Sequence, residues 1–187
     1  MTCEIRNTNS CWYAMRDLSR KHAKLPAYKL LKQMGYEVFT PMVSKVVTEK
    51  GKRKSKEEPF MLDLLFVREE REKLNPAVEK ISNLQYRYKR GGYCEPMMVP
   101  DKEMTRFIHA VESSRLPRFY RPDEITQNMC GEYVRIVGGA LDGYEGHLVT
   151  IKGSKYKRLL VSLPNFLSAA VEVTPDFIEI LQLKRTC

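Results

Sequence analysis

Runs of apolar residues divide the chain into a mixed first part and a strand-rich second part. Residues 11–15 (Cys-Trp-Tyr-Ala-Met) form a short apolar run, which is typical of a central strand. Between residues 23 and 34 the apolar positions fall on one helical face, with Pro26 near its start and Gly35 placed to end the helix. Three further strands are predicted over residues 36–41, 42–48 and 60–67, and the last is apolar enough to lie inside a sheet.

Two shorter elements follow in the first part. Residues 75–82 predict a short helix with Pro76 at its first position, where the missing N–H costs no hydrogen bond. Residues 85–88 and 95–99 flank Arg90-Gly91-Gly92, which is typical of a β-hairpin. The first part therefore predicts an antiparallel sheet with flanking helices.

A last helix and a loss of pattern end the first part. Asp101 is placed to cap a helix with the i, i+3, i+4, i+7 spacing of Met104, Phe107, Ile108 and Val111. Residues 113–128 have no periodicity and contain Pro117 and Pro122, so we predict a linker there. The expected fold class is α+β, with a sheet-and-helix domain over residues 1–112 and a small β-barrel over residues 129–187.

Glycines crowd together at the start of the predicted barrel. Residues 133–137 and 147–151 predict two strands, because they are rich in β-branched and aromatic residues. Between them stand Gly138, Gly139, Gly143 and Gly146, and such a loop needs unusual backbone angles or close approach by another segment. The strands expected to complete the barrel are residues 159–163, 169–174 and 177–181.

Charge points to a polyanionic partner of the first part. The net charge is +9, and residues 1–112 carry 22 Lys and Arg against 15 Asp and Glu, whereas residues 131–187 carry 7 against 6. Residues 49–58 are polar, strongly basic and without apolar periodicity, which predicts a loop or a hairpin tip.

Candidate catalytic chemistry is sparse. The five cysteines have no Cys-x-x-Cys spacing and the three histidines have no ligand spacing, which argues against a disulfide framework or a zinc site. There is no phosphate-binding glycine loop and no Gly-x-Ser-x-Gly, so we expect no enzyme, no catalytic residue, no metal and no cofactor. Asp63 in an apolar run is the exception, since a buried carboxylate with a raised pKa can be catalytic, but a bulge or a partner-facing position is the simpler explanation.

No segment predicts a membrane location. No window approaches the ~20 apolar residues that a membrane-spanning helix needs. The N-terminus lacks the apolar core of a signal peptide, so the expected location is the reducing cytoplasm.

The order of these elements resembles the NusG family of transcription elongation factors, in which an NGN domain precedes a KOW domain. The resemblance rests on the Trp-Tyr strand, the helix ending in Gly, the Phe-Thr-Pro strand end, the basic hairpin, the Leu-Phe-Val strand and the glycine-rich hairpin, and it covers about residues 11–182. The absence of a long insertion and the Val-Pro-Asp-Lys-Glu-Met turn over residues 99–104 are most similar to the UpxY-type antiterminators of capsular polysaccharide operons.

This resemblance implies a monomeric factor that binds the β′ clamp helices of RNA polymerase and suppresses pausing or termination. The implied polymerase contacts are Trp12, Phe39, Pro41, Leu64 and Phe66. A departure occurs at Leu62-Asp63-Leu64, which stands where the family often has Pro-Gly-Tyr. A place in the core is the alternative role for these residues, because large apolar side chains are mostly buried.

Two further groups of residues have two interpretations each. Lys50, Lys52, Arg53, Lys54 and Lys56 either form a solvated tip or attract the phosphates of the non-template DNA strand in the elongation complex. Leu141 and Tyr144 either cap the end of the barrel or bind the KOW partner, which in bacterial relatives is Rho or a small-subunit ribosomal protein. The alternative function is an RNA-binding or ribosome-associated KOW protein, although the strands lack an aromatic RNA-binding pattern.

Overall fold

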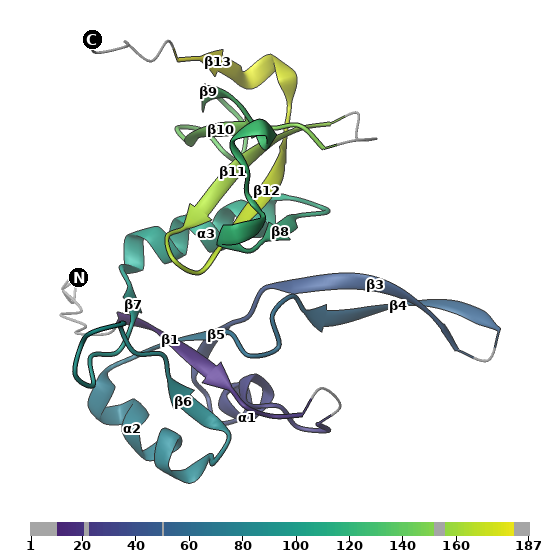
Figure 1. Cartoon of the computed structure of the whole chain (residues 1–187). Helices are drawn as coiled ribbons and strands as arrows, with labels where there is room; N and C mark the ends of the chain where they lie inside the picture. The colour runs from purple at the N-terminus through teal and green to yellow at the C-terminus, as the bar shows by residue number, and fades with distance from the viewer. Residues whose placement is uncertain (1–10, 21–22, 50, 152–155, 182–187) are drawn as a thin grey trace, which may run out of the picture. The chain divides into compact units, whose positions relative to one another are not determined.

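The computed structural model describes residues 11–20, 23–49, 51–151 and 156–181, and the chain forms two compact units that divide between Asp101 and Lys102 (Figure 1). The first unit contains two helices and seven strands among the described residues. In chain order they are β1 (Cys11–Asp17), α1 (Ala27–Gln33), β2 (Glu37–Phe39), β3 (Met42–Glu49), β4 (Lys52–Pro59), β5 (Leu65–Glu69), α2 (Arg71–Lys80), β6 (Leu84–Tyr86) and β7 (Met98–Val99).

Strand β1 lies inside the sheet of the first unit. It pairs antiparallel with β5 on one side and with both β6 and β7 on the other, and β2 adds to the far edge of β5. Since side chains alternate along a strand, one face receives Tyr13, Met15, Leu65 and Val67. These residues share a buried cluster with Leu31 of α1 and Leu74 of α2, so the two helices cover this face. The antiparallel sheet with flanking helices is confirmed.

Asp17 fixes the start of α1. The helix begins after Pro26, which has no side chain that can cap it. The buried Asp17 carboxylate instead accepts the backbone N–H of Ala27 at 2.7 Å and that of Ser19 at 2.8 Å. It thus satisfies one of the free N–H groups of the helix from a neighbouring strand. Gly35, with a φ of 87°, follows the helix end as predicted.

We expect Asp17→Ala to lower the free energy of unfolding by about 2 kcal/mol, because two N–H groups lose a charged acceptor. Asp17→Asn keeps one acceptor oxygen, so its loss should be about half as large. Urea unfolding followed by the emission of Trp12, the single tryptophan, measures both. Equal stability of the alanine variant and the wild type would contradict this role of Asp17.

Three predicted elements of the first unit differ from the structure. The basic stretch predicted as a loop or tip is mostly the strand β4, which pairs with β3 from Met42↔Pro59 to Glu49↔Lys52. Both faces of most of this two-stranded ribbon are exposed, so β4 has no buried side from which an apolar period could arise. In the run 60–67 only the residues from Leu65 onwards are in a strand.

The second helix also begins earlier than predicted. It starts at Arg71, and Pro76 lies inside it instead of at its first position. The buried residues Leu74 and Ala77 are one turn apart and hold the helix against the sheet. Proline is favoured at the first position of a helix, but here the packing of Leu74 and Ala77 favours a helix that already includes the turn before Pro76.

The part of the second unit that the structure describes consists of one α-helix and a six-stranded antiparallel sheet in the order β13-β9-β10-β11-β12-β8. The five strands predicted from residue 133 onwards are confirmed as β9–β13. The elements are α3 (Asp101–Ser113), β8 (Arg118–Tyr120), β9 (Cys130–Ile136), β10 (Glu145–Val149), β11 (Lys157–Leu163), β12 (Leu167–Val173) and β13 (Ile178–Ile180), with short 3₁₀ turns at Pro122–Glu124, Gln127–Met129 and Pro175–Phe177.

The stretch predicted as a linker, residues 113–128, is built into the second unit. Strand β8 pairs with β12, and the buried Arg158 donates to the carbonyl of Leu116 at 2.6 Å while it pairs with Glu172 at 2.6 Å. The Ser114 hydroxyl accepts the N–H of Glu172. The units therefore divide before α3, not after it as predicted, because a three-residue strand and long-range hydrogen bonds leave no local signal in the sequence.

Candidate functional site

The sheet face opposite α1 and α2 carries two rows of side chains across three strands. The pairings Glu37↔Arg68 and Arg68↔Trp12 make the first row, and Phe39↔Phe66 and Phe66↔Ala14 make the second. The rings of Phe39 and Phe66 lie 6.4 Å apart between centroids. The structure thus brings Trp12, Phe39 and Phe66, which are far apart in the sequence, onto one face of the sheet. Pro41 lies immediately before β3 and Leu64 immediately before β5.

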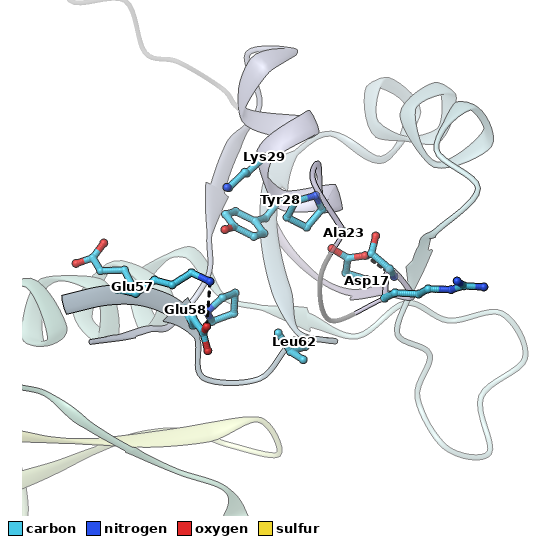
Figure 2. Close-up of a pocket in the computed structure, with 12 residues that line it drawn as sticks. Asp17, Ala23, Tyr28, Lys29, Glu57, Glu58 and Leu62 are labelled. Carbon is cyan, nitrogen blue, oxygen red and sulfur yellow. Dashed lines mark hydrogen bonds and ion pairs between the residues drawn. The ribbon is translucent and has the colours of Figure 1, made fainter. Parts of the chain in front are cut away.

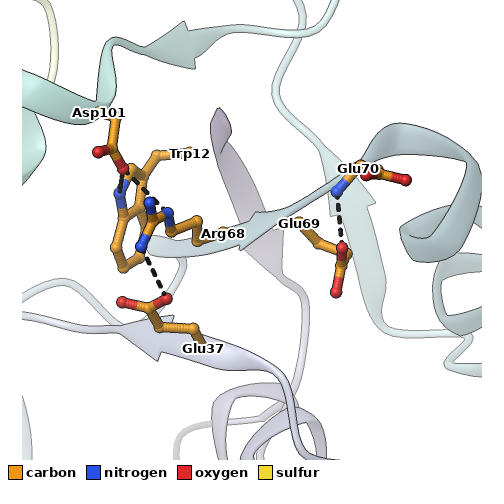
Figure 3. Close-up of polar contacts among 6 residues, drawn as sticks. All are labelled: Trp12, Glu37, Arg68, Glu69, Glu70 and Asp101. Atoms are coloured by element: carbon orange, nitrogen blue, oxygen red, sulfur yellow. Dashed lines mark hydrogen bonds and ion pairs between the residues drawn. The ribbon is translucent and has the colours of Figure 1, made fainter. Parts of the chain in front are cut away.

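A polar network borders this face (Figure 3). The indole N–H of Trp12 donates to Asp101 Oδ1 at 3.2 Å, and Arg68 Nε lies 2.9 Å from the same oxygen. The other end of the Arg68 guanidinium reaches Glu37 Oε2 at 3.3 Å. Helix capping is the only role that the sequence predicts for Asp101, and it predicts none for Arg68 and Glu37, because their meeting depends on strand register.

The five residues implied as polymerase contacts differ in how deeply they are buried. Trp12, Leu64 and Phe66 are buried, as is Pro41, whereas Phe39 is partly exposed. Phe39 is therefore the member of this set that offers a surface to a partner in the structure. The contacts themselves stay a prediction.

Asp63 is not a buried carboxylate. Its side chain is about half exposed and accepts a hydrogen bond from Arg87 Nη2 at 2.8 Å, and the same nitrogen reaches the Asp63 carbonyl at 3.0 Å. It lies in the turn before β5, where Leu62-Asp63-Leu64 departs from the family pattern. An ion pair at a strand end explains Asp63 without any catalytic role.

A cleft of about 250 Å³ lies between the start of α1 and the base of the β3–β4 hairpin (Figure 2). Its apolar wall includes Tyr28 and Leu62, and burial, with a smaller contribution from the Asp17 carboxylate, raises the pKa of Tyr28. The charged residues around it balance in number: Arg20, Lys29, Lys56, Asp17, Glu57 and Glu58. No local sequence pattern predicts this cleft, because three separate segments line it.

The basic hairpin has two different faces. Cross-strand partners share a face, so the register places Lys45, Lys52, Lys54 and Lys56 on one side. Arg53 lies on the other side with Ser44, Val46, Thr48 and Ser55. Glu58 joins the lysine side at the hairpin base, where hydrogen bonds from Lys45 and Lys56 lower its pKa. Lys50 lies outside the described residues.

The two implied KOW contacts are buried within the second unit. Leu141 borders a small cavity with Ile136 and Val173. The Tyr144 hydroxyl donates to the carbonyl of Arg106 and lies 2.9 Å from His109 Nδ1, which must therefore be the donor to it. The Arg106 guanidinium lies 4.5 Å from the Tyr144 ring centroid, and burial raises the pKa of this phenol. Tyr144 thus holds α3 on the sheet in this structure.

Comparison with known proteins identifies the family. A family model described as transcription termination factor NusG matches residues 10–108, more than half of the chain. The chain belongs to the NusG family. The chain is therefore a NusG-family transcription factor, and members of this family generally bind RNA polymerase.

A solved structure titled "Domain interaction in Thermotoga maritima NusG" is similar to the chain at 16% sequence identity. The similarity covers 92% of this chain and 98% of that one, with a TM-score of 0.48. No curated protein gave a match. The matched family segment extends into α3, which the structure groups with the second unit.

The described part of the chain holds no group of three His, Cys, Asp or Glu side chains arranged to bind a metal ion. None of the described helices is both long and apolar enough to cross a membrane.

The two phenylalanines of the second row should respond differently to truncation. We expect Phe66→Ala to lower the free energy of unfolding by about 3–5 kcal/mol, because the ring is fully buried. Phe39→Ala should cost clearly less, since part of its ring already faces solvent. Urea unfolding followed by Trp12 emission compares them, and equal losses would contradict the assigned burial.

Proposed function

We propose that this NusG-family protein is a transcription elongation or antitermination factor that binds RNA polymerase through its first unit and suppresses pausing or termination. The family match over residues 10–108 carries the proposal. The proposed place of action is the cytoplasm, with the polymerase, and the proposed mechanism is binding without catalysis.

We further propose that the second row of side chains on the sheet, which holds Phe39 and Phe66 and is here called the aromatic row, contacts the β′ clamp helices of the polymerase. An apolar surface with an aromatic anchor is the usual centre of such an interface. Phe39 is the anchor that is accessible in this structure. Contact through Trp12, Leu64 or Phe66 would require their side chains to become exposed, because all three are buried.

Phe39→Ala is expected to weaken binding to core RNA polymerase about tenfold, the effect of losing one aromatic anchor. Met34→Ala is the matched control, because Met34 is 44% exposed and follows α1, a helix on the opposite face of the sheet. Equilibrium binding to immobilised polymerase measures both variants. Equal affinity of the two would exclude Phe39 from the interface.

For the lysine side of the hairpin we propose contact with the non-template DNA strand. Lys52, Lys54 and Lys56 follow one another at every second residue, so their Cα atoms are about 7 Å apart along β4. Such a row can follow the phosphates of one strand without reading its bases. The described β3–β4 ribbon has no aromatic side chain that would stack on a base.

The two faces of the hairpin allow a test with matched variants. Lys54→Gln and Arg53→Gln each remove one positive charge from adjacent residues that lie on opposite faces. We expect Lys54→Gln to reduce the slope of log affinity against log salt for the elongation complex by about 0.7, the value for one phosphate of a single strand. Arg53→Gln should leave the slope nearly unchanged. Equal effects of both variants would indicate nonspecific attraction without a preferred face.

The second unit is proposed to be the KOW domain that recruits Rho or a small-subunit ribosomal protein. Leu141 and Tyr144 remain its proposed contacts, and both need to become accessible before a partner can touch them. The composition of the turn at residues 99–104 supports a UpxY-type role at capsular polysaccharide operons.

A run-off transcription assay across a pause site and a terminator tests the proposed function. We expect added protein to shorten the pause or increase read-through. Templates with and without a polysaccharide-operon leader separate a specialised factor from a general one. Unchanged pausing and termination on every template, with polymerase binding confirmed, would contradict the proposed activity.

A further inference from the structure

The loop between β6 and β7 presents aromatic and basic side chains that the proposed function does not use. Backbone hydrogen bonds from Met97 to Arg87 and from Lys89 to Glu95 close the loop, and Tyr88 bridges to Pro96. A tight turn at its tip is closed by the N–H of Gly92 and the carbonyl of Lys89. The loop therefore has a defined backbone conformation from which its side chains project.

Two tyrosines of this loop are unusually exposed. Tyr93 at the tip is 98% exposed, and Tyr88 is 49% exposed. The Tyr88 ring lies 6.3 Å from that of Tyr86, which is buried and donates its hydroxyl to Asn75. Tyr88 thus rests on a fixed core residue. A wholly exposed aromatic ring contributes little to folding, and both faces of the Tyr93 ring are accessible to a ligand.

The charged residues of the loop leave one cation unpaired. Arg87 is held by Asp63, and Lys89 pairs with Glu95. Arg90, exposed in the turn three residues before Tyr93, has no acidic partner among the residues that the structure describes. An exposed ring and an exposed guanidinium three residues apart in one turn match the combination of base stacking and phosphate attraction that binds single-stranded nucleic acids.

We propose that this loop binds single-stranded nucleic acid, with a base stacked on Tyr93, a second stacking surface at Tyr88 and a phosphate held by Arg90. A protein partner is less well matched, because anchors at protein interfaces lie within packed apolar surroundings. The neighbours of Tyr93 are instead two glycines, Cys94 and the basic residues of the turn. Stacking needs only the face of the base, so binding should depend little on sequence.

This site is separate from the lysine side of the hairpin. Strands β6 and β7 pair with one side of β1, whereas the hairpin follows β2 at the opposite edge of the sheet. Figure 1 shows the loop and the hairpin on opposite sides of the first unit. Four strands at the usual spacing put the two edges about 15 Å apart. The loop therefore adds base stacking to a unit whose hairpin offers only charge.

Binding of labelled oligonucleotides to the full chain tests the proposal without polymerase, so its outcome is independent of the proposed function. The probes are oligothymidylate, oligouridylate and an abasic deoxyribose-phosphate strand of equal length. We expect Tyr93→Ala to weaken binding to the two base-containing probes roughly tenfold and to leave the abasic probe unaffected. A larger loss of affinity for oligouridylate would identify RNA as the strand that the loop binds. A larger loss of affinity for oligothymidylate would identify displaced DNA.

Control variants distinguish the loss of base stacking from the loss of a positive charge and from general damage to the fold. Tyr93→Phe keeps the ring and should retain wild-type affinity, and Tyr156→Ala removes another tyrosine, 66% exposed in the second unit, without effect. Arg90→Gln should lower the salt slope by about 0.7 for all three probes, whereas Tyr93→Ala should leave that slope unchanged. Equal binding of Tyr93→Ala and wild type to the base-containing probes would overturn the proposal. So would a loss of polymerase binding in Tyr93→Ala without any loss of oligonucleotide binding, which would identify a protein contact.

Discussion

The antiparallel pairing of β1 with β5 determines the roles of most side chains in the first unit. The register Ala14↔Phe66 sends Tyr13 and Met15 towards α1 and α2, and Trp12 and Phe66 to the opposite face. A slip by one residue would exchange the two sets. The core, the aromatic row and the contacts of Arg68 with Glu37 and Asp101 all depend on this one register.

Positive charge in the first unit is concentrated on projections from this sheet. The lysine side of the β3–β4 ribbon and the β6–β7 loop extend from opposite edges, and neither has to pack against a core. Solvated charges of one sign repel one another weakly in water, so such projections can collect them at little cost to stability. A polyanion would supply the compensating charge, and this agrees with the two proposed nucleic-acid contacts of the first unit.

Asp101 is the last residue of the first unit, its side chain contacts that unit, and residues that follow it contact the second unit. Its carboxylate is held by Trp12 and Arg68 of the first unit, and its backbone begins α3. After it, Tyr144 holds α3, and Arg158 and Glu172 hold residues 114–116 to the second sheet. These long-range contacts include residues on both sides of Pro117, so the units divide before α3 and not at the prolines further on.

The sequence by itself determined the elements with a local signal and, through their order, the resemblance to the NusG family. The apolar run at 11–15, the glycine after α1, the spacing from Met104 to Val111 and the strands of the second unit depend on periodicity and backbone preference, which neighbouring residues encode. Only the tertiary structure decided that β4 is a strand, that Arg53 faces away from Lys54, and that Phe39 is accessible while Phe66 is buried. Strand register and burial arise from contacts between residues far apart in the chain, and no local pattern records them.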